Sequence, residues 1–111
     1  SVFFGDRYVG LVYRSEDVSH LYRMAVYDTA AVKPENFFLK SFYLDIEYTD
    51  IFLGEDTFGA YNETDCVIYT YRGMEKFNGQ FDKPVKLMIP QSNSYKYLLV
   101  TEDSFDTIQL K

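Results

Sequence analysis

The chain has few of the residues needed for metal binding or for nucleophilic catalysis. It contains one histidine, His20, and one cysteine, Cys66, among 111 residues. A zinc site needs three or four His, Cys or carboxylate ligands, and a Cys–His pair needs both groups within hydrogen-bonding reach. We therefore predict no metal, no cofactor and no catalytic residue, and we expect a protein that is not an enzyme. One unpaired cysteine is compatible with the cytoplasm and with an extracellular location, so the localisation is unknown at this stage.

Long apolar runs are also absent. No run approaches the roughly 18–20 residues that span a bilayer, so we expect no membrane insertion. Apolar residues make up 47% of the chain and charged residues 25%, which is typical of a globular protein. The length corresponds to about one domain. We therefore expect residues 1–111 to form a single β domain, either complete in itself or excised from a larger protein.

Tryptophan is missing, whereas the chain has 11 tyrosines and 10 phenylalanines, which favour half-buried strands. Apolar and polar residues alternate over several segments separated by Gly, Pro and polar clusters, and no long window keeps the helical period. This pattern predicts an all-β fold, namely a single compact antiparallel β-sandwich, jelly-roll or Ig-like, of about 7–8 strands, with a small β-barrel as the alternative. The expected strands cover residues 7–14, 20–27, 38–48, 65–72, 84–90, 95–102 and 103–110.

The clearest alternation lies in SFYLDIEYTD, residues 41–50. The period slips at Asp50, which predicts a bulge or a strand end near Thr49–Asp50 because one extra residue switches the faces of a strand. Residues 54–59 and 73–80 contain Gly and Asn-Gly and are expected to form a turn and a loop. A short helical turn is expected around Glu35–Leu39, next to Pro34.

Basic residues are missing from residues 41–71, which contain seven acidic ones. Residues 1–40 are electrically balanced and residues 72–111 carry one net positive charge, so the middle segment accounts for the whole net charge of −6. A negatively charged region attracts positively charged partners and repels phosphate groups. We therefore expect no direct binding of nucleic acid, which normally requires a basic face.

These observations favour a non-enzymatic protein-interaction domain that binds a basic partner through an acidic, tyrosine-containing face, such as an inhibitor, a neutralising protein or an adaptor module. A merely solvated surface is the alternative for the acidic residues, and packing in the core is the alternative for the tyrosines. The residues predicted to bind the partner all belong to the segment 41–71. They are Tyr43, Asp45, Glu47, Asp50, Glu55, Asp56, Tyr69 and Tyr71.

Two other classes of function are compatible with the sequence. One is a β-sandwich that binds carbohydrate or another small ligand. Tyr69 and Tyr71 would form an exposed platform with Tyr95 and Tyr97 if their strands pair, and carboxylates of the loops would hold Ca²⁺. The other is a structural domain that assembles through an exposed edge strand. The oligomeric state is unknown from the sequence. The loop carboxylates are Glu55, Asp56, Glu63, Asp65, Glu102, Asp103 and Asp106.

Overall fold

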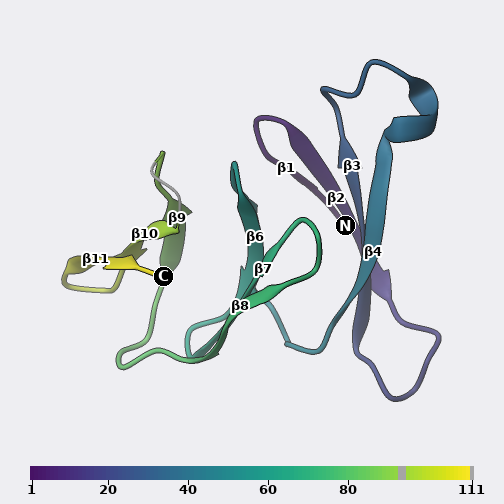
Figure 1. The fold of residues 1–111 in the computed structure, drawn as a ribbon. Coiled ribbons are helices and arrows are strands. Elements are labelled where there is room, and N and C mark those ends of the chain that lie inside the picture. Colours follow the sequence, from purple (N-terminus) through teal and green to yellow (C-terminus); the bar gives the residue numbers. More distant parts are fainter. Residues whose placement is uncertain (93–94, 111) are drawn as a thin grey trace.

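The chain forms three antiparallel sheets, each a simple up-and-down meander (Figure 1). A computed structural model describes residues 1–92 and 95–110. The first sheet consists of β1 (Val2–Phe4), β2 (Tyr8–Arg14), β3 (Tyr22–Asp28) and β4 (Phe38–Leu44). The middle sheet consists of β5 (Asp50–Leu53), β6 (Thr57–Tyr61), β7 (Asp65–Thr70) and β8 (Glu75–Gln80). The third sheet consists of β9 (Leu87–Pro90), β10 (Lys96–Val100) and β11 (Phe105–Gln109).

The predicted all-β fold is confirmed, including antiparallel pairing and sheets that pack face to face as in a sandwich. The predicted helical turn is present as a 3₁₀ turn, η1 (Pro34–Asn36). The strand count differs, because the described residues form eleven strands in three sheets. The sequence interpretation missed β1, β5, β6 and β8. Gly59 and Gly79 lie inside β6 and β8, where they pair with Phe52, Ile68 and Cys66 rather than make turns.

The middle sheet is apolar on both faces, and each face is covered by a neighbouring sheet. Ile51, Leu53 and Phe58 point toward the first sheet and pack in a cluster with Met24 and Leu44. The opposite face of the middle sheet packs against the third sheet in a second cluster. This second cluster contains Phe52, Tyr61, Cys66, Ile68, Met88 and Tyr97. Burial of both faces explains why β5 and β6 show no alternation of apolar and polar residues.

The slip in period at Asp50 marks the passage from one sheet to the next. β4 ends at Leu44, earlier than predicted, and the chain leaves the first sheet through residues 45–49. β5 then begins the middle sheet at Asp50, so Ile51 and Phe52 face different neighbouring sheets. The expected strand end near Thr49–Asp50 is therefore a change of sheet, and no bulge is required there.

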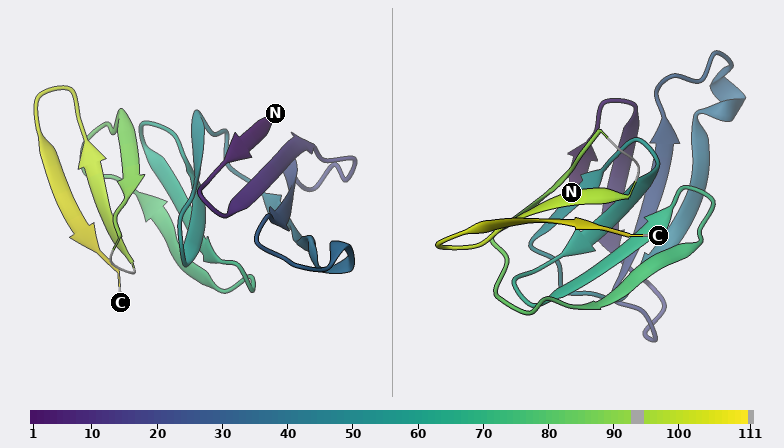
Figure 2. Two further views of the ribbon diagram at one scale, coloured as in Figure 1. Left: turned by 90° about the horizontal axis from the view of Figure 1, so that it is seen from above. Right: turned by 60° about the vertical axis from the view of Figure 1, so that its left-hand side comes forward.

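The first strands of the three sheets lie beside one another. Cα atoms of β1 and β5, and of β5 and β9, approach within 8 Å at several positions. Each later strand of a sheet lies farther from these first strands, and the chain returns from β4 to β5 and from β8 to β9 (Figure 2). Across residues 1–92 and 95–110, we find no helix with the length and apolar character needed to cross a membrane.

The connections between strands gather at two ends of the molecule. Because neighbouring strands are antiparallel, connections alternate between the ends along the chain. The connections after β1, β3, β5, β7 and β9 lie at one end, at the top of Figure 1. Those after β2, β4, β6 and β8 lie at the other end, at the bottom of Figure 1, and the turn after β10 lies at the left margin of that view. This arrangement decides which charged side chains meet.

Candidate functional site

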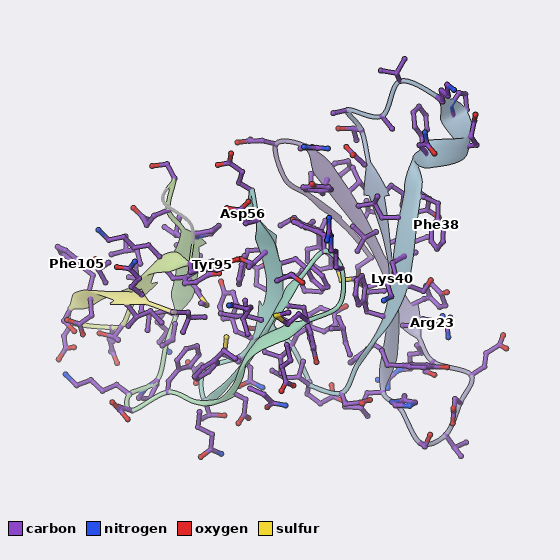
Figure 3. All side chains as sticks on the ribbon, in the orientation of Figure 1. Arg23, Phe38, Lys40, Asp56, Tyr95 and Phe105 are labelled. Atoms are coloured by element: carbon purple, nitrogen blue, oxygen red, sulfur yellow. The ribbon has the colours of Figure 1, made fainter. Side chains whose placement is uncertain are left out.

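The acidic residues predicted as one face lie at both ends of the molecule. Asp45 and Glu47 precede β5, whereas Glu55 and Asp56 follow it in the turn to β6. Strand β5 separates the two pairs, and Asp56 lies at the upper end in Figure 3. The segment 41–71 is therefore not a continuous acidic surface, because a short strand carries the chain from one end to the other.

One end is nevertheless strongly acidic, and we call it the acidic end. It consists of residues 15–20, 45–49, 62–64, 81–86 and 101–104, which connect strands within a sheet or link one sheet to the next, together with Asp65, the first residue of β7. These residues include nine acidic and two basic ones, whereas the rest of the chain has eight acidic and nine basic residues. The acidic end thus has a net charge of −7, and the remaining residues have a net charge of +1, which together give the −6 of the protein. Its acidic residues are Glu16, Asp17, Asp45, Glu47, Glu63, Asp65, Asp82, Glu102 and Asp103.

Contacts between neighbouring connections hold the acidic end together. The Asp45 carboxylate lies 2.8 Å from His20 Nδ1 and accepts a hydrogen bond from the backbone N–H of Leu21 at 3.0 Å. Asn62 Nδ2 donates to the Glu47 carbonyl at 2.8 Å. The Glu63 carboxylate forms an ion pair with Lys86. The backbone N–H of Lys86 donates a hydrogen bond to the carbonyl of Val100, the residue that directly precedes the connection 101–104. The five connections therefore form one surface.

Several carboxylates of this surface are held in place while remaining exposed. Asp17 accepts hydrogen bonds from the Ser19 hydroxyl at 2.7 Å and the Ser19 N–H at 3.0 Å. These bonds lower the pKa of Asp17 below its ordinary value because they favour the charged form. The Tyr22 hydroxyl donates to Glu47 Oε2 at 2.9 Å. The acidic end is thus an ordered array of negative charges.

Tyr43 and Asp50, two of the residues predicted to bind the partner, lie outside the acidic end. Tyr43 lies on the outer face of the first sheet, where its ring stacks on His20 at 3.8 Å and the Arg23 guanidinium lies 4.8 Å from its centroid. Asp50 is half-buried at the start of β5 and accepts a hydrogen bond from the Tyr61 hydroxyl at 3.3 Å. Asp50 therefore belongs to the structure of β5 rather than to the acidic end.

The predicted tyrosine platform is wrong, because the strands that would build it lie in different sheets. β7 carries Tyr69 in the middle sheet and Tyr71 directly follows it, whereas β10 carries Tyr97 in the third sheet. Tyr71 stacks on Tyr8 at 3.8 Å between the first and middle sheets, and its hydroxyl donates to the Gly54 carbonyl at 2.6 Å. Burial raises the pKa of Tyr71 above its ordinary value. Packing between sheets is therefore the role that the structure assigns to these rings.

A hollow of about 610 Å³ lies at the end opposite the acidic end. Turns from all three sheets line it, including Asp6 and Arg7 after β1, Glu55 after β5 and Gln91 after β9. Arg7 donates to both carboxylate oxygens of Asp28, at 3.0 and 2.8 Å. This pairing lowers the pKa of Asp28 and keeps the guanidinium fixed at the rim. The hollow thus presents charges of both signs.

The predicted calcium ligands do not assemble. Glu55 and Asp56 lie at the end with the hollow, whereas Glu63 and Glu102 lie at the acidic end. Within the described part of the chain, no three His, Cys, Asp or Glu side chains lie close enough to hold a metal ion. The two residues considered for a catalytic pair are also held by different partners. His20 pairs with Asp45, and the Cys66 thiol lies 3.8 Å from the Met88 sulfur, where burial raises its pKa to about 12.

Sequence reasoning missed five members of the acidic end, because it grouped charges along the chain rather than by connection. All five lie in connections that follow even-numbered strands, which share one end of a meander. The alternation of ends places these connections together only when all eleven strands are counted, so the predicted strands, which lacked β1, β5, β6 and β8, could not have brought them to one end. The five residues are Glu16, Asp17, Asp82, Glu102 and Asp103.

Comparison with curated proteins and with solved structures yields no match. A family model, by contrast, covers nearly the whole chain, from residue 1 to residue 110. The match spans all three sheets. The chain belongs to the Family of unknown function (DUF5711).

Proposed function

We propose that the protein is a non-enzymatic interaction domain that binds a basic protein partner through its acidic end. The observation that carries this proposal is the segregation of charge, with nine acidic and two basic residues in five adjoining connections and the first residue of β7. Eight of the nine acidic residues are exposed. Such a surface speeds the encounter with an oppositely charged partner, and ordered carboxylates favour one orientation of that partner.

The proposal can be tested with a short polylysine peptide as a defined basic probe. We expect the double variant Glu16→Lys, Glu102→Lys to reduce the association rate constant by about tenfold, because steering depends on local charge. Both side chains are exposed, so the fold should be retained. Asp45 and Glu47 are less suitable targets because they hold His20, Leu21 and Tyr22 in place. Kinetic binding measurements on an immobilised probe provide the readout.

The matched control makes the same change of net charge at other positions. In the variant Glu35→Lys, Glu55→Lys, the substituted residues lie in η1 and in the turn after β5, away from the acidic end. We expect this control to bind the probe nearly as fast as the unmodified protein. Equal losses in both variants would mean that only the total charge matters, and the proposal of a binding surface would be wrong.

A second candidate function is supported by the hollow at the opposite end. Its volume of about 610 Å³ falls within the usual range of small-ligand sites, and its lining combines Arg7, Asp6 and Glu55 with backbone turns. A small polar ligand such as a sugar would fit this chemistry. Thermal-shift measurements with a panel of neutral and acidic sugars test this candidate. A stabilisation that Glu55→Arg abolishes and Glu35→Arg preserves would support it, and the absence of any stabilisation would reject it.

A further inference from the structure

The hollow at the end opposite the acidic end is built from matching turns of the three sheets. In each sheet, the connection between the first two strands contributes to its wall, and these connections lie at the top of Figure 1. In the first and the middle sheet, the N–H of a turn glycine donates to the carbonyl three residues later at 2.8 Å. Asp6 and Glu55 directly follow these glycines, Gly5 and Gly54, so the two carboxylates occupy equivalent positions.

The turns around the hollow pack directly on one another. A Cβ atom at Gly5 would lie 2.3 Å from the Leu53 carbonyl oxygen, so glycine is required for the first turn to lie on the end of β5. A Cβ atom at Gly54 would lie 3.3 Å from the Cβ atom of Pro90, so the second turn also lies close to the third sheet. The Tyr71 hydroxyl donates to the Gly54 carbonyl at 2.6 Å. Packing between the sheets therefore forms the hollow before any ligand binds, as in most small-ligand sites.

Two carboxylates of the hollow are available to a positively charged group. Asp6 and Glu55 both line the hollow and are exposed. Across residues 1–92 and 95–110, neither side chain forms an ion pair or a hydrogen bond. The charge of the basic residue beside them, Arg7, is compensated by its ion pair with Asp28. The hollow therefore attracts a cation, and an ammonium group suits it because its three N–H donors can reach more than one acceptor.

Arg7 adds hydrogen-bond donors for a carboxylate at the same rim. Its Nε and Nη2 atoms donate to Asp28 at 3.0 and 2.8 Å, and its guanidinium carbon lies 5.1 Å from the centroid of the Tyr8 ring. These contacts hold the guanidinium group in one orientation. The Nη1 atom forms no hydrogen bond with the described residues, so its N–H groups remain able to donate. Because the planar guanidinium group has donors on more than one edge, it can bind a second carboxylate while Asp28 stays paired.

Apolar side chains complete the lining of the hollow. Leu53, Ile89 and Pro90 contribute to it from the ends of β5 and β9. Leu53 is 7% exposed and Ile89 is 38% exposed, so an apolar group of a ligand that covers them gains further burial. The hollow thus offers acceptors for a cation, donors for a carboxylate and an apolar wall.

We propose that the hollow binds an α-amino acid with an apolar side chain. The ammonium group of the ligand pairs with the carboxylates of Asp6 and Glu55, its carboxylate accepts hydrogen bonds from Arg7, and its side chain packs on Leu53 and Ile89. This inference rests on the second candidate function, because it names the class of small polar ligand that the hollow takes.

Isothermal titration calorimetry with leucine and two analogues tests the proposal. Leucinamide lacks the carboxylate of leucine, and N-acetyl-leucine lacks its ammonium group. We expect leucine to bind and each analogue to bind at least tenfold more weakly, because each loses charge-assisted hydrogen bonds. Absence of leucine binding would overturn the proposal. Either analogue binding as tightly as leucine would also overturn it, because the hollow would then not recognise both charged groups.

Two substitutions in the hollow assign the recognition of each charged group. Glu55→Gln should weaken leucine binding by about tenfold. Arg7→Lys should also weaken it by about tenfold and leave the binding of leucinamide unchanged, since leucinamide has no carboxylate. A merely structural role of Arg7 would lower the affinity for both compounds equally, and that result would overturn its assignment. The Lys side chain can still pair with Asp28, so the fold should be retained.

Matched controls make the same chemical changes away from the hollow. Glu35→Gln lies in η1, and Arg14→Lys lies at the opposite end of β2 from Arg7. Both variants should bind leucine as the unmodified protein does. A loss of leucine binding in these controls equal to that in the hollow variants would contradict the assignment of the site.

The sugars of the thermal-shift panel separate this inference from the function on which it rests. If a sugar stabilises the protein in the hollow and leucine does not bind, the hollow is a small-ligand site and the proposed ligand class is wrong. If neither leucine nor any sugar binds, both the ligand class and the second candidate function are wrong. Binding of polylysine to the acidic end is a separate result, because that surface lies at the other end of the strands.

Discussion

The buried hydroxyl pair of Tyr97 and Thr57 is the clearest single-residue link between the middle and third sheets. Tyr97 is 1% exposed and Thr57 is 4% exposed, and their hydroxyl groups form a hydrogen bond across the two sheets. Removing one partner leaves the other polar group buried without a partner. We therefore expect Tyr97→Phe to lower the free energy of unfolding by about 1–3 kcal/mol, measured by urea denaturation.

A double variant separates this polar cost from a loss of packing. Thr57→Val removes the second hydroxyl group at nearly constant side-chain volume. The combination Tyr97→Phe, Thr57→Val should therefore be more stable than Tyr97→Phe alone, because neither polar group is left unpaired. If the free energy lost by the double variant equals the sum of the losses of the two single variants, the two hydroxyl groups do not stabilise each other, and the expectation is wrong.

At the scale of elements, the pairing of β5 with β6 depends on a glycine. Phe52 lies directly opposite Gly59, and its ring covers the glycine. A Cβ atom at position 59 would lie 2.6 Å from the Phe52 ring and 2.6 Å from the Val67 carbonyl oxygen. Since the backbone of β7 cannot move aside easily, we expect Gly59→Ala to cost about 1–3 kcal/mol in thermal or urea unfolding.

The matched control is a glycine on the last strand of the same sheet. A Cβ atom at Gly79 in β8 would meet the Phe77 ring at 3.0 Å, and the ring is the flexible end of a partly exposed side chain. Gly79→Ala should therefore change the stability far less than Gly59→Ala. If the two variants were equally destabilised, the close approach of three strands at Gly59 would not be the cause.

At the scale of the whole molecule, charge and apolar surface are separated in space. The acidic end gathers the connections on one side of the strands, whereas exposed apolar side chains such as Phe38 and Phe105 lie on the outer faces of the first and third sheets, at the two extremes of the succession of sheets (Figure 3). Substitutions at the acidic end therefore leave both outer sheet faces unchanged.

Salt should weaken the proposed attraction between the acidic end and a basic partner. Raising the ionic strength from about 0.05 M to about 0.5 M screens exposed charges. We therefore expect a slower association with polylysine at the higher ionic strength, measured on the immobilised probe. An association rate constant that salt leaves unchanged would contradict electrostatic steering by the acidic end.

Much of the fold could be predicted because its signals are local. Alternation identified β2, β3, β4, β7 and β10, and Pro34 marked the position of η1. The missed strands are those where alternation is absent or interrupted by glycine. β6 is buried on both faces, so Phe58, Ala60 and Tyr61 give no polar position to reveal its period. A bulge or strand end was predicted near Asp50, whereas β4 ends at Leu44 and Asp50 begins β5 in the next sheet, a change that only the neighbouring layers reveal.

The sequence by itself determined the class of the fold, the sign of the charge and the position of most turns, because these follow from residue type and nearest neighbours. Only the tertiary structure decided which turns share an end, which tyrosines are covered and which sheet faces remain open. These features depend on contacts between residues far apart in the chain. Asp45 meets His20 and Tyr71 meets Tyr8 because three meanders stack, and no local pattern specifies that stacking.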